Sequence, residues 1–219
     1  MALPLFNDYP LNDGLVFHTG TLPRDLVWTD TDFERLWNRH PHERHTVIMI
    51  GKPVQVPRWQ QAYGANYSYT GSRNNALPIP RELLALLEWS RKTIDDRLNG
   101  LLLNWYSGAE DYIGAHHDST KELVQGSPIV TISFGETRVF RLTRWERRQK
   151  VAQHDFEANH GRVFVVDWDM NKAWKHEVLK RAAYSGRRIS VTLRAFSRGL
   201  LLPEQSNERD TTPSEIEIH

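Results

Sequence analysis

The chain is organised around residues 104–141, which open with NWYSGAEDYIGAHHD and continue, after a polar and glycine-containing link, with SPIVTISFG at residues 127–135. His116 and Asp118 lie at the centre of this stretch, two residues apart. In an extended segment, residues i and i+2 project to the same side, so an imidazole and a carboxylate can contact one cation. A third ligand is expected downstream, and His176 is the natural candidate.

The composition limits how a metal ion can be held. The 219 residues include no cysteine, which excludes disulfides and thiolate sites and leaves histidine and carboxylate as ligands. Two histidines and one carboxylate that face open coordination positions are typical of non-haem Fe(II) oxygenases. The pattern therefore predicts an Fe(II) site built from His116, Asp118 and His176.

Length and hydrophobicity favour a folded, intracellular protein. Hydrophobic residues make up 39% of the chain, more than a disordered chain carries. No stretch approaches the roughly 18 consecutive apolar residues of a membrane span. The first residues lack the basic flank and apolar run of a signal peptide. We expect no membrane association and an intracellular location, with nucleus and cytoplasm both open.

The net charge of the chain is only +1, but residues 138–150 form a local basic run. Its charged members are Arg138, Arg141, Arg144, Arg147, Arg148 and Lys150, against Glu146 alone. A run of this kind is most often a solvated face, and it can also grip phosphates. The sequence leaves both interpretations open.

The N-terminal half mixes several element types. Residues 1–30 combine Pro, Gly and short apolar runs, so we expect an irregular arm laid over the domain. The pattern Thr31-Asp32-Phe33-Glu34 reads as a capping box that opens a helix to about Trp37. The further elements expected are a hairpin at 46–56, a strand at 66–71 and one long helix at 81–98.

From Gly100 onward the pattern is almost entirely β. The candidate strands cover residues 101–106, 129–134, 139–143, 151–156, 163–167, 176–179 and 188–196. Many short strands with glycine turns are typical of a sandwich or barrel, and a double-sheet jelly roll is one way to close it. The prediction is a mostly β fold with flanking helices (α+β), in a single domain over residues 1–200 with a flexible tail at 203–219.

Two arginines in the last predicted strand suggest an anion site. Arg188 and Arg194 share one side of the strand, because positions six apart have the same parity. Two inward guanidinium groups are costly unless an anion meets them. A dicarboxylate is an apt partner, since guanidinium binds carboxylates through two parallel hydrogen bonds. Asn104 and Tyr106 also share one face and can donate further hydrogen bonds.

Six ordered motifs carry a family resemblance. They are Asn104-x-Tyr106, His116-x-Asp118, Gly126-Ser127-Pro128-Ile129, Ser133-Phe134-Gly135-x-x-Arg138-x-Phe140, Trp174-Lys175-His176 and Arg188-x-Ser190-x-Thr192-x-Arg194. Together, over about residues 45–197, they resemble the AlkB family of 2-oxoglutarate- and Fe(II)-dependent dioxygenases, closest to the branch that repairs duplex DNA. The resemblance implies a double-stranded β-helix (jelly-roll) core over 99–197, preceded by nucleotide-recognition hairpins and a support helix at about 45–98.

The resemblance also implies residue roles. Fe(II) would be bound by His116, Asp118 and His176. The residues implied for 2-oxoglutarate are Asn104, Tyr106, Arg188, Ser190 and Arg194. Arg188 would pair with the distal carboxylate, helped by Tyr106, and Arg194 and Asn104 would lie near the keto-acid end. Ser190 stands where the family has Asn, which puts one cosubstrate hydrogen bond in doubt.

The implied reaction couples oxidative decarboxylation of 2-oxoglutarate with O₂ to hydroxylation of an N-alkyl carbon, which then leaves as aldehyde. Alkylated DNA, double- or single-stranded, or RNA would be the partner of a monomeric enzyme. Two other interpretations stay open: an oxygenase acting on a protein or small molecule, and a binding module that keeps only the fold.

Four residues point to a nucleobase. Ile50 stands at the position of an apolar wedge in a hairpin that resembles the family's finger, and such wedges offset part of the cost of unstacking a base. Tyr67 and Tyr69 align with an aromatic lid that would clamp a flipped base. Arg58 can reach a phosphate or cap a strand. Each has a plain alternative, namely a hairpin packed on its own domain or core packing.

Residues after the His-x-Asp motif depart from the family. Family repair enzymes carry acidic residues near the damaged base, and Ser119 and Thr120 occupy those places here. A cationic methylated base would therefore meet less negative charge than usual. We expect both residues near the substrate, with the preferred lesion left open.

Overall fold

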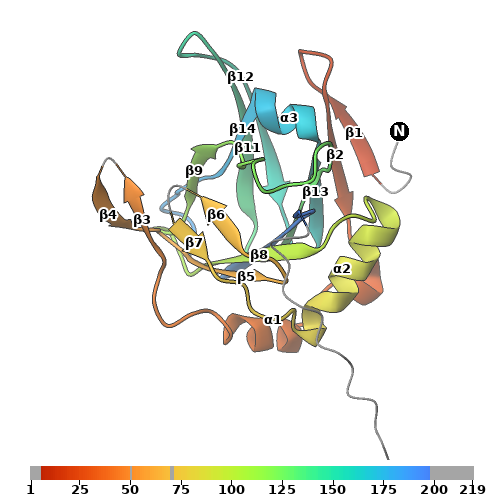
Figure 1. Cartoon of the computed structure of the whole chain (residues 1–219), viewed down its shortest axis with the longest axis vertical. Coiled ribbons are helices and arrows are strands. Elements are labelled where there is room, and N and C mark those ends of the chain that lie inside the picture. Colours follow the sequence, from red (N-terminus) through yellow and green to blue (C-terminus); the bar gives the residue numbers. More distant parts are fainter. Residues whose placement is uncertain (1–5, 50, 70–71, 198–219) are drawn as a thin grey trace, which may run out of the picture.

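A computed structural model describes residues 6–49, 51–69 and 72–197, and it places two antiparallel sheets face to face (Figure 1). The larger sheet has the strand order β1 (Phe6–Pro10), β2 (Val16–Thr21), β13 (Arg162–Val166), β10 (Ile129–Gly135), β15 (Arg188–Arg194), β8 (Gly100–Tyr106), β5 (Trp59–Tyr63). The smaller sheet has the order β12 (Gln149–Ala158), β11 (Arg138–Glu146), β14 (Trp174–Val178), β9 (Ile113–His116). The predicted fold class, a mostly β jelly roll with a few helices, is confirmed.

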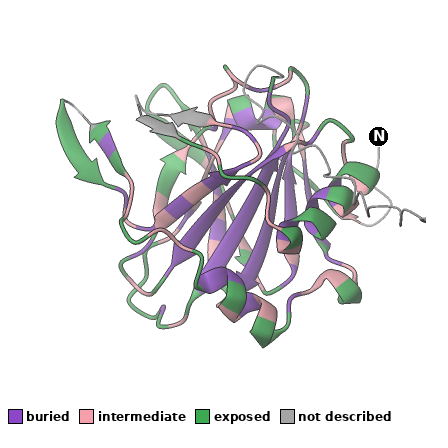
Figure 2. Cartoon of the chain, turned by 60° about the horizontal axis from the view of Figure 1, so that its bottom comes forward, coloured by how far each residue is buried: buried purple, intermediate pink, exposed green. Residues whose placement is uncertain are grey.

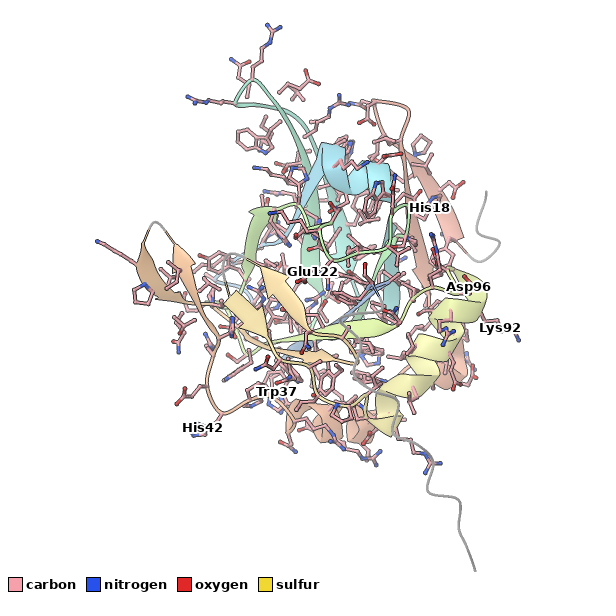
Figure 3. The ribbon with its side chains drawn as sticks, viewed as in Figure 1. His18, Trp37, His42, Lys92, Asp96 and Glu122 are labelled. Atoms are coloured by element: carbon pink, nitrogen blue, oxygen red, sulfur yellow. The ribbon has the colours of Figure 1, made fainter. Side chains whose placement is uncertain are left out.

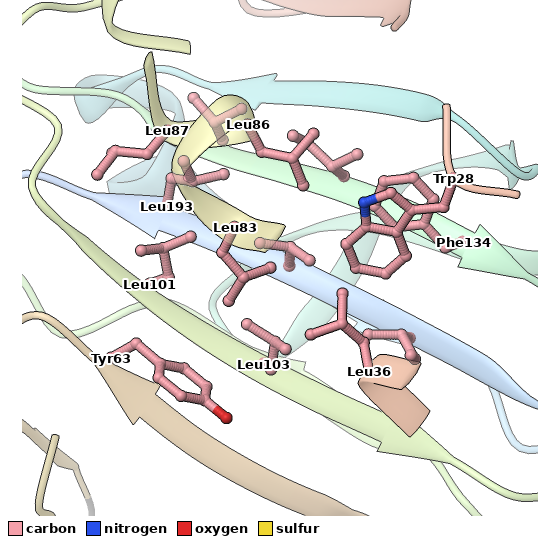
Figure 4. Packing of buried hydrophobic residues seen from close by; sticks show 14 of the residues in the cluster. Trp28, Leu36, Tyr63, Leu83, Leu86, Leu87, Leu101, Leu103, Phe134 and Leu193 are labelled. Atoms are coloured by element: carbon pink, nitrogen blue, oxygen red, sulfur yellow. The ribbon is translucent and has the colours of Figure 1, made fainter. Parts of the chain in front are cut away.

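The outer face of the larger sheet is apolar and is covered by two helices, α1 (Asp30–Trp37) and α2 (Arg81–Thr93) (Figures 1 and 4). Every second residue of β8 and β15 points to this face, because side chains alternate along a strand. The buried residues from these two strands are Leu101, Leu103, Trp105, Ile189, Val191 and Leu193. At one end of this cluster the Trp28 ring stacks on Phe134, with 3.6 Å between the centroids. This face forms a continuous core.

The inner face of the larger sheet meets the smaller sheet through aromatic packing. Phe164 of β13 and Phe140 of β11 have ring centroids 4.7 Å apart, and Phe17 of β2 lies 5.5 Å from Phe164. The cluster joins strands from both sheets, so the sheets are held together by apolar contact. Figure 2 shows the central strands of the larger sheet buried along most of their length.

Two small hairpins lie outside the two main sheets. They are β3 (Thr46–Met49) with β4 (Lys52–Gln55), and β6 (Tyr67–Tyr69) with β7 (Ser72–Asn74). The first projects from the body of the molecule and is largely exposed (Figures 1 and 2). Ile48 is 53% exposed and Val54 40% exposed. The predicted hairpin at residues 46–56 is confirmed, and these two apolar side chains face solvent instead of packing on the domain.

The expectation of an irregular arm over residues 1–30 is wrong for residues 6–21, and residues 1–5 lie outside the described part of the chain. β1 and β2 form a hairpin, and β2 continues the larger sheet by pairing with β13. Phe17 in β2 is fully buried. The partner strand lies far away in the sequence, so the local pattern of residues 16–21 could not reveal the pairing.

The helix boundaries also differ from the predicted ones. The capping box is formed by Thr29 and Asp32: the Thr29 hydroxyl accepts from the Asp32 backbone N–H at 3.2 Å, and the Asp32 carboxylate accepts from the Thr29 N–H at 3.0 Å. The helix therefore begins at Asp30, before the position that the sequence suggested. The long helix ends at Thr93, and Leu98 instead joins the core beneath it.

The strands predicted after residue 100 are all present with small shifts at their ends. Besides β1 and β2, the elements that were not predicted include β5, β7, β9 and the short helix α3 (Trp168–Ala173). β5 pairs with β8, so the larger sheet takes a strand from residues 45–98, the part assigned to nucleotide recognition. The single domain over 1–200 stays a prediction, and the tail at 203–219 lies outside the described residues.

A short 3₁₀ turn, η1 (Arg24–Leu26), completes the described elements. Among the helices in the described part of the chain, none combines the length and apolar character that a bilayer crossing requires.

Candidate metal and cosubstrate site

Strand register brings the predicted cosubstrate residues onto one patch of the inner face. Ser190 pairs with Asn104, and Arg188 pairs with Tyr106, on the adjacent strands β15 and β8. On the other side of β15, Ser190 pairs with Ser133 of β10. Residues paired across antiparallel strands point to the same face, so all five side chains lie together.

Between the two sheets this patch lines a cavity of about 290 Å³. The residues around it come from both sheets and from the segment after β9: Arg58, Leu102, Asn104, Tyr106, Ile113, His116, His117, Asp118, Ser119, Thr131, Phe140, His176, Val178, Ser190, Thr192 and Arg194. The smaller sheet therefore contributes three apolar side chains, Ile113, Phe140 and Val178, together with two histidines, and the larger sheet contributes mainly polar side chains.

His116, Asp118 and His176 converge at this cavity. His116 ends β9 and pairs with His176 of β14, so the ladder itself places the two imidazoles side by side. Asp118 Oδ1 lies 3.4 Å from His116 Nε2 and 3.9 Å from His176 Nε2. One ligand atom from each residue lies within 4.8 Å of the other two. Metal–ligand bonds near 2.1 Å bring ligand atoms within about 4.2 Å of each other, so small movements suffice to hold one ion.

Hydrogen bonding prepares His116 for this task. Its Nδ1 lies 2.9 Å from the Gly114 carbonyl oxygen, and because a carbonyl only accepts, Nδ1 carries the proton. The Nε2 lone pair is then free to point at the Asp118 side of the cavity. The second ring of the pair, His176, stacks on Phe140 with 5.7 Å between centroids, which fixes its plane.

The charges at the triad suit a cation. Burial by itself would raise the pKa of the Asp118 carboxyl, but the Arg194 guanidinium and the two imidazoles outweigh burial and hold this pKa well below its usual value. Burial, and then the neighbouring His116, lowers the pKa of His176 to about 3. The site therefore presents an ionised carboxylate and a neutral imidazole, which are the forms that bind metal ions.

The two arginines of β15 have different partners. Arg194 donates from Nη2 and Nε to Asp118 Oδ2, at 2.6 and 3.0 Å, which orients the carboxylate and leaves Oδ1 toward the histidines. Arg188 is fully buried, lies over the Tyr106 ring at 4.9 Å and donates from Nη2 to Ser133 Oγ at 2.7 Å. Its Nε and Nη1 make no hydrogen bond to any described residue.

Unsatisfied N–H groups on a buried guanidinium are costly, and burial lowers the pKa of Arg188. A carboxylate bound against the guanidinium would satisfy at least one of these groups. The residues present therefore fit a carboxylate-bearing cosubstrate beside a metal ion, as the sequence suggested.

One polar contact at the site was not foreseen. Asn171, in α3, is 1% exposed and clamps the backbone of Asp118: its Oδ1 accepts from the Asp118 N–H at 2.9 Å and its Nδ2 donates to the Asp118 carbonyl at 3.0 Å. Its own carbonyl accepts from His117 Nδ1 at 2.6 Å. Helix α3 has only six residues, too few for a periodic signal, so no sequence pattern pointed to it.

The structure describes only some of the residues that were predicted to contact the substrate. Ser119 lines the cavity, while Thr120 is half-buried beside it and is not among the lining residues. Ile50 and the side chains of Tyr67 and Tyr69 lie outside the described residues. Arg58 needs a correction: it is 5% exposed and donates to Asn104 Oδ1 at 2.8 Å, so it faces the cavity and cannot extend to a phosphate at the surface.

The basic run divides into two parts. Arg138 is 1% exposed and holds the carbonyls of Gly108 and Asp111, so it is structural. The next two arginines of β11 pair with acidic neighbours, Arg141 with Asp155 and Arg144 with Asp13.

Three cations of the run remain exposed at the tip of the β11–β12 hairpin: Arg147, Arg148 and Lys150. Figure 3 shows nitrogen-bearing side chains extending from this tip, away from the body of the molecule. The arginines at the start of the basic run therefore make structural contacts, and the cations at its end are exposed to solvent.

A jelly roll with two histidines, one carboxylate and an inward guanidinium around one cavity defines a class, the non-haem Fe(II) oxygenases that use a carboxylate cosubstrate. A family model described as the 2OG-Fe(II) oxygenase superfamily matches residues 28–194. The chain belongs to this superfamily and, within it, to the AlkB family. The predicted Fe(II), 2-oxoglutarate and O₂ are confirmed as the metal and cosubstrates of the family.

Within the AlkB family, the chain is similar to proteins of two names. The DNA oxidative demethylase ALKBH2 of Homo sapiens is 32% identical over 158 residues, which cover 68% of this chain and 60% of the relative. The Arabidopsis thaliana protein of the same name is 28% identical over 210 residues, which cover 82% of this chain and 65% of the relative. The Homo sapiens alpha-ketoglutarate-dependent dioxygenase alkB homolog 3 is 25% identical over 179 residues, which cover 78% of this chain and 62% of the relative.

A solved structure, titled "The structure of OsALKBH1", superposes with a TM-score of 0.54 at 13% identity, over 81% of this chain and 96% of that one, which supports the fold. The chain spans about three fifths of the length of the ALKBH2 relatives that it matches.

Proposed function

We propose that the protein is an oxidative demethylase of alkylated nucleobases in DNA or RNA, acting on a base that is flipped into the cavity. The observation that carries the proposal is the convergence of His116, Asp118 and His176 at one cavity. The buried, unsatisfied guanidinium of Arg188 lies behind its polar wall, paired in register with the lining residue Tyr106. The relatives named DNA oxidative demethylase support the substrate class.

The proposal assigns roles to the metal-binding triad and to the polar residues near it. His116 Nε2, His176 Nε2 and Asp118 Oδ1 would hold Fe(II), which, with 2-oxoglutarate and O₂, supplies the oxidising power for hydroxylation. Arg188 would bind the distal carboxylate of 2-oxoglutarate. The polar side chains beside it, Asn104, Tyr106 and Ser190, would complete the cosubstrate contacts.

Water exclusion also follows from this chain's own residues. The apolar wall formed by Ile113, Phe140 and Val178 keeps the cavity dry on the side of the smaller sheet. Arg194 keeps the Asp118 carboxylate ionised and oriented.

The tip of the β11–β12 hairpin supports a polyanionic partner. Arg147 and Arg148 occupy a two-residue turn with φ of +46° and +70°. Such turns favour Asn-Gly, because most side chains are strained at positive φ. Two cations held there at a conformational cost suit contact with phosphates, whose neutralisation gives salt-dependent affinity.

The lesion would be extruded from the stack by the β3–β4 hairpin, where Ile50 is proposed as the wedge, and would be clamped by Tyr67 and Tyr69. Arg58 and Ser119 would line the base pocket. The positive charge of Arg58 favours an uncharged alkylated base over a cationic one, because like charges repel at short range.

Aldehyde release tests the proposal directly. The protein is incubated with Fe(II), 2-oxoglutarate and oligonucleotides carrying 1-methyladenine, 3-methylcytosine or an etheno base, in single- and double-stranded form. We expect aldehyde in step with succinate from at least one lesion. Protein that binds 2-oxoglutarate but releases aldehyde from none of them would refute the nucleobase assignment and point to a protein or small-molecule substrate.

A further inference from the structure

Of the three proposed iron ligands, Asp118 alone lies outside a strand. β9 ends at His116, and the last residue pair between β9 and β14 is His116 with His176. Arg194 orients the Asp118 carboxylate but contacts only its side chain. The backbone at Asp118 therefore needs another partner if the carboxylate is to stay at the metal.

Asn171 supplies that partner. Its amide meets the Asp118 N–H and C=O together, as a neighbouring strand would, and so extends the hydrogen bonding of β9 by two residues. Both groups are buried, where an unpaired backbone group is costly. The carbonyl of Asn171 also accepts from His117, so the whole segment from residue 116 to 118 is held.

The position of Asn171 in the chain matters as much as its contacts. It lies on α3, directly before β14, the strand that carries His176. One short segment thus contributes a ligand and fixes the backbone of a second ligand. Movement of α3 would displace Asp118 and His176 together.

We propose that Asn171 is a positioning residue that sets the geometry of the metal site by holding the Asp118 backbone, an inference that rests on the proposed function of the triad. Outer partners of metal ligands typically contribute about 10- to 100-fold to metal affinity. Loss of this amide should therefore weaken metal binding, in addition to any effect on folding.

The chain contains a matched control. Asn99 makes the same paired contact with the backbone of Phe196, accepting from its N–H at 2.8 Å and donating to its carbonyl at 2.9 Å. It contacts none of the three ligands. Asn99→Ala therefore removes an equivalent pair of side-chain hydrogen bonds, while the Asn99 backbone N–H keeps its bond to the Arg194 carbonyl.

The test is calorimetric titration of the full chain with Mn(II) in the presence of 2-oxoglutarate, alongside thermal unfolding of the metal-free protein. We expect similar losses of Tm in the two alanine variants. Mn(II) should bind at least about tenfold more weakly to Asn171→Ala and within about twofold of wild type to Asn99→Ala. Equal Mn(II) affinity in both variants would overturn the inference.

Asn171→Asp provides a second variant of the same size if the alanine variant fails to fold. Its added negative charge would strengthen cation binding by simple attraction, whereas the loss of the donor to the Asp118 carbonyl would weaken it. Weaker Mn(II) binding supports positioning, and equal or tighter binding contradicts it. Wild type that binds neither Mn(II) nor 2-oxoglutarate would instead refute the proposed function.

Discussion

The two faces of the larger sheet are built from the same strands and do different work. In β15, Leu193 points to the helices and is fully buried in the core, while its neighbour Thr192 points to the cavity. The same alternation separates Leu103 from Asn104 in β8. A period of two residues thus encodes the core on one face and the site on the other. Changes on the helix face should affect stability, and changes on the cavity face should affect binding and turnover.

The largest expected effect lies on the cavity face. His116→Ala removes a proposed ligand from a partly exposed position, so the fold should remain while aldehyde release falls by at least about a thousandfold. Aldehyde release and the Tm are measured on the same preparation. Turnover within tenfold of wild type would break the ligand assignment.

Asp118→Ala serves as the contrasting variant. It removes the carboxylate that pairs with buried Arg194, and loss of one partner of a buried ion pair costs about 3–5 kcal/mol. We expect both turnover and stability to fall, measured by aldehyde release and denaturant unfolding. An unchanged unfolding midpoint would show that the pair does not hold the cavity face together.

On the helix face, Leu193→Ala should cost about 2–5 kcal/mol of unfolding free energy, because it leaves a void in the core. The affinity for 2-oxoglutarate should stay within about twofold. Thr192→Val, its neighbour on the opposite face, removes a hydroxyl from the cavity wall but leaves no void, so it should cost less stability than Leu193→Ala. Chemical unfolding measures the stability of each variant, and calorimetry measures its affinity for 2-oxoglutarate. A loss of 2-oxoglutarate affinity in Leu193→Ala alone would contradict the assignment of stability to the helix face and binding to the cavity face.

A smaller effect is expected far from both faces, at the hairpin tip. Replacing Arg147-Arg148 by Asn-Gly relieves two positive-φ arginines and should keep or raise the Tm. Oligonucleotide affinity should fall. The negative slope of the logarithm of the binding constant against the logarithm of the salt concentration should become shallower by about 1–2. Fluorescence anisotropy at several salt concentrations measures both quantities. An unchanged slope would mean that the tip does not touch phosphates.

The smallest effect concerns the choice of lesion. Ser119→Asp adds a carboxylate at the cavity lining and should raise the relative kcat/KM for cationic bases by about tenfold at most. The measurement is competition between a 1-methyladenine and an etheno oligonucleotide in one reaction. A shift toward the etheno base would contradict the proposed influence of charge.

The sequence predicted what depends on local spacing. His116 and Asp118 share a side of an extended segment, and Arg188 and Arg194 share parity on β15, so short-range alternation was enough to group each pair. The strands after residue 100, apart from β9, were also predicted from local patterns. The placement of His176 needed the fold as well, since it depends on the pairing of β14 with β9.

What the sequence missed depends on distant partners. β2 becomes a strand because β13 pairs with it, and β5 because β8 does, and neither partner is visible locally. Arg58 reads as a surface cation until Asn104 is seen to hold it inside the cavity. Asn171 lies on a helix too short to carry a pattern, so its contact with Asp118 emerges only in three dimensions.

The central claim is that the cavity face holds a metal ion and a dicarboxylate anchored by Arg188, and Arg188→Met tests it most directly. Methionine keeps an apolar stem of similar length and removes a buried charge whose Nε and Nη1 have no partner among the described residues. Calorimetric titration of 2-oxoglutarate into Mn(II)-loaded protein should show one site in wild type and at least about 100-fold weaker binding in the variant, at an unchanged Tm. Equal affinity in the two proteins would contradict the account.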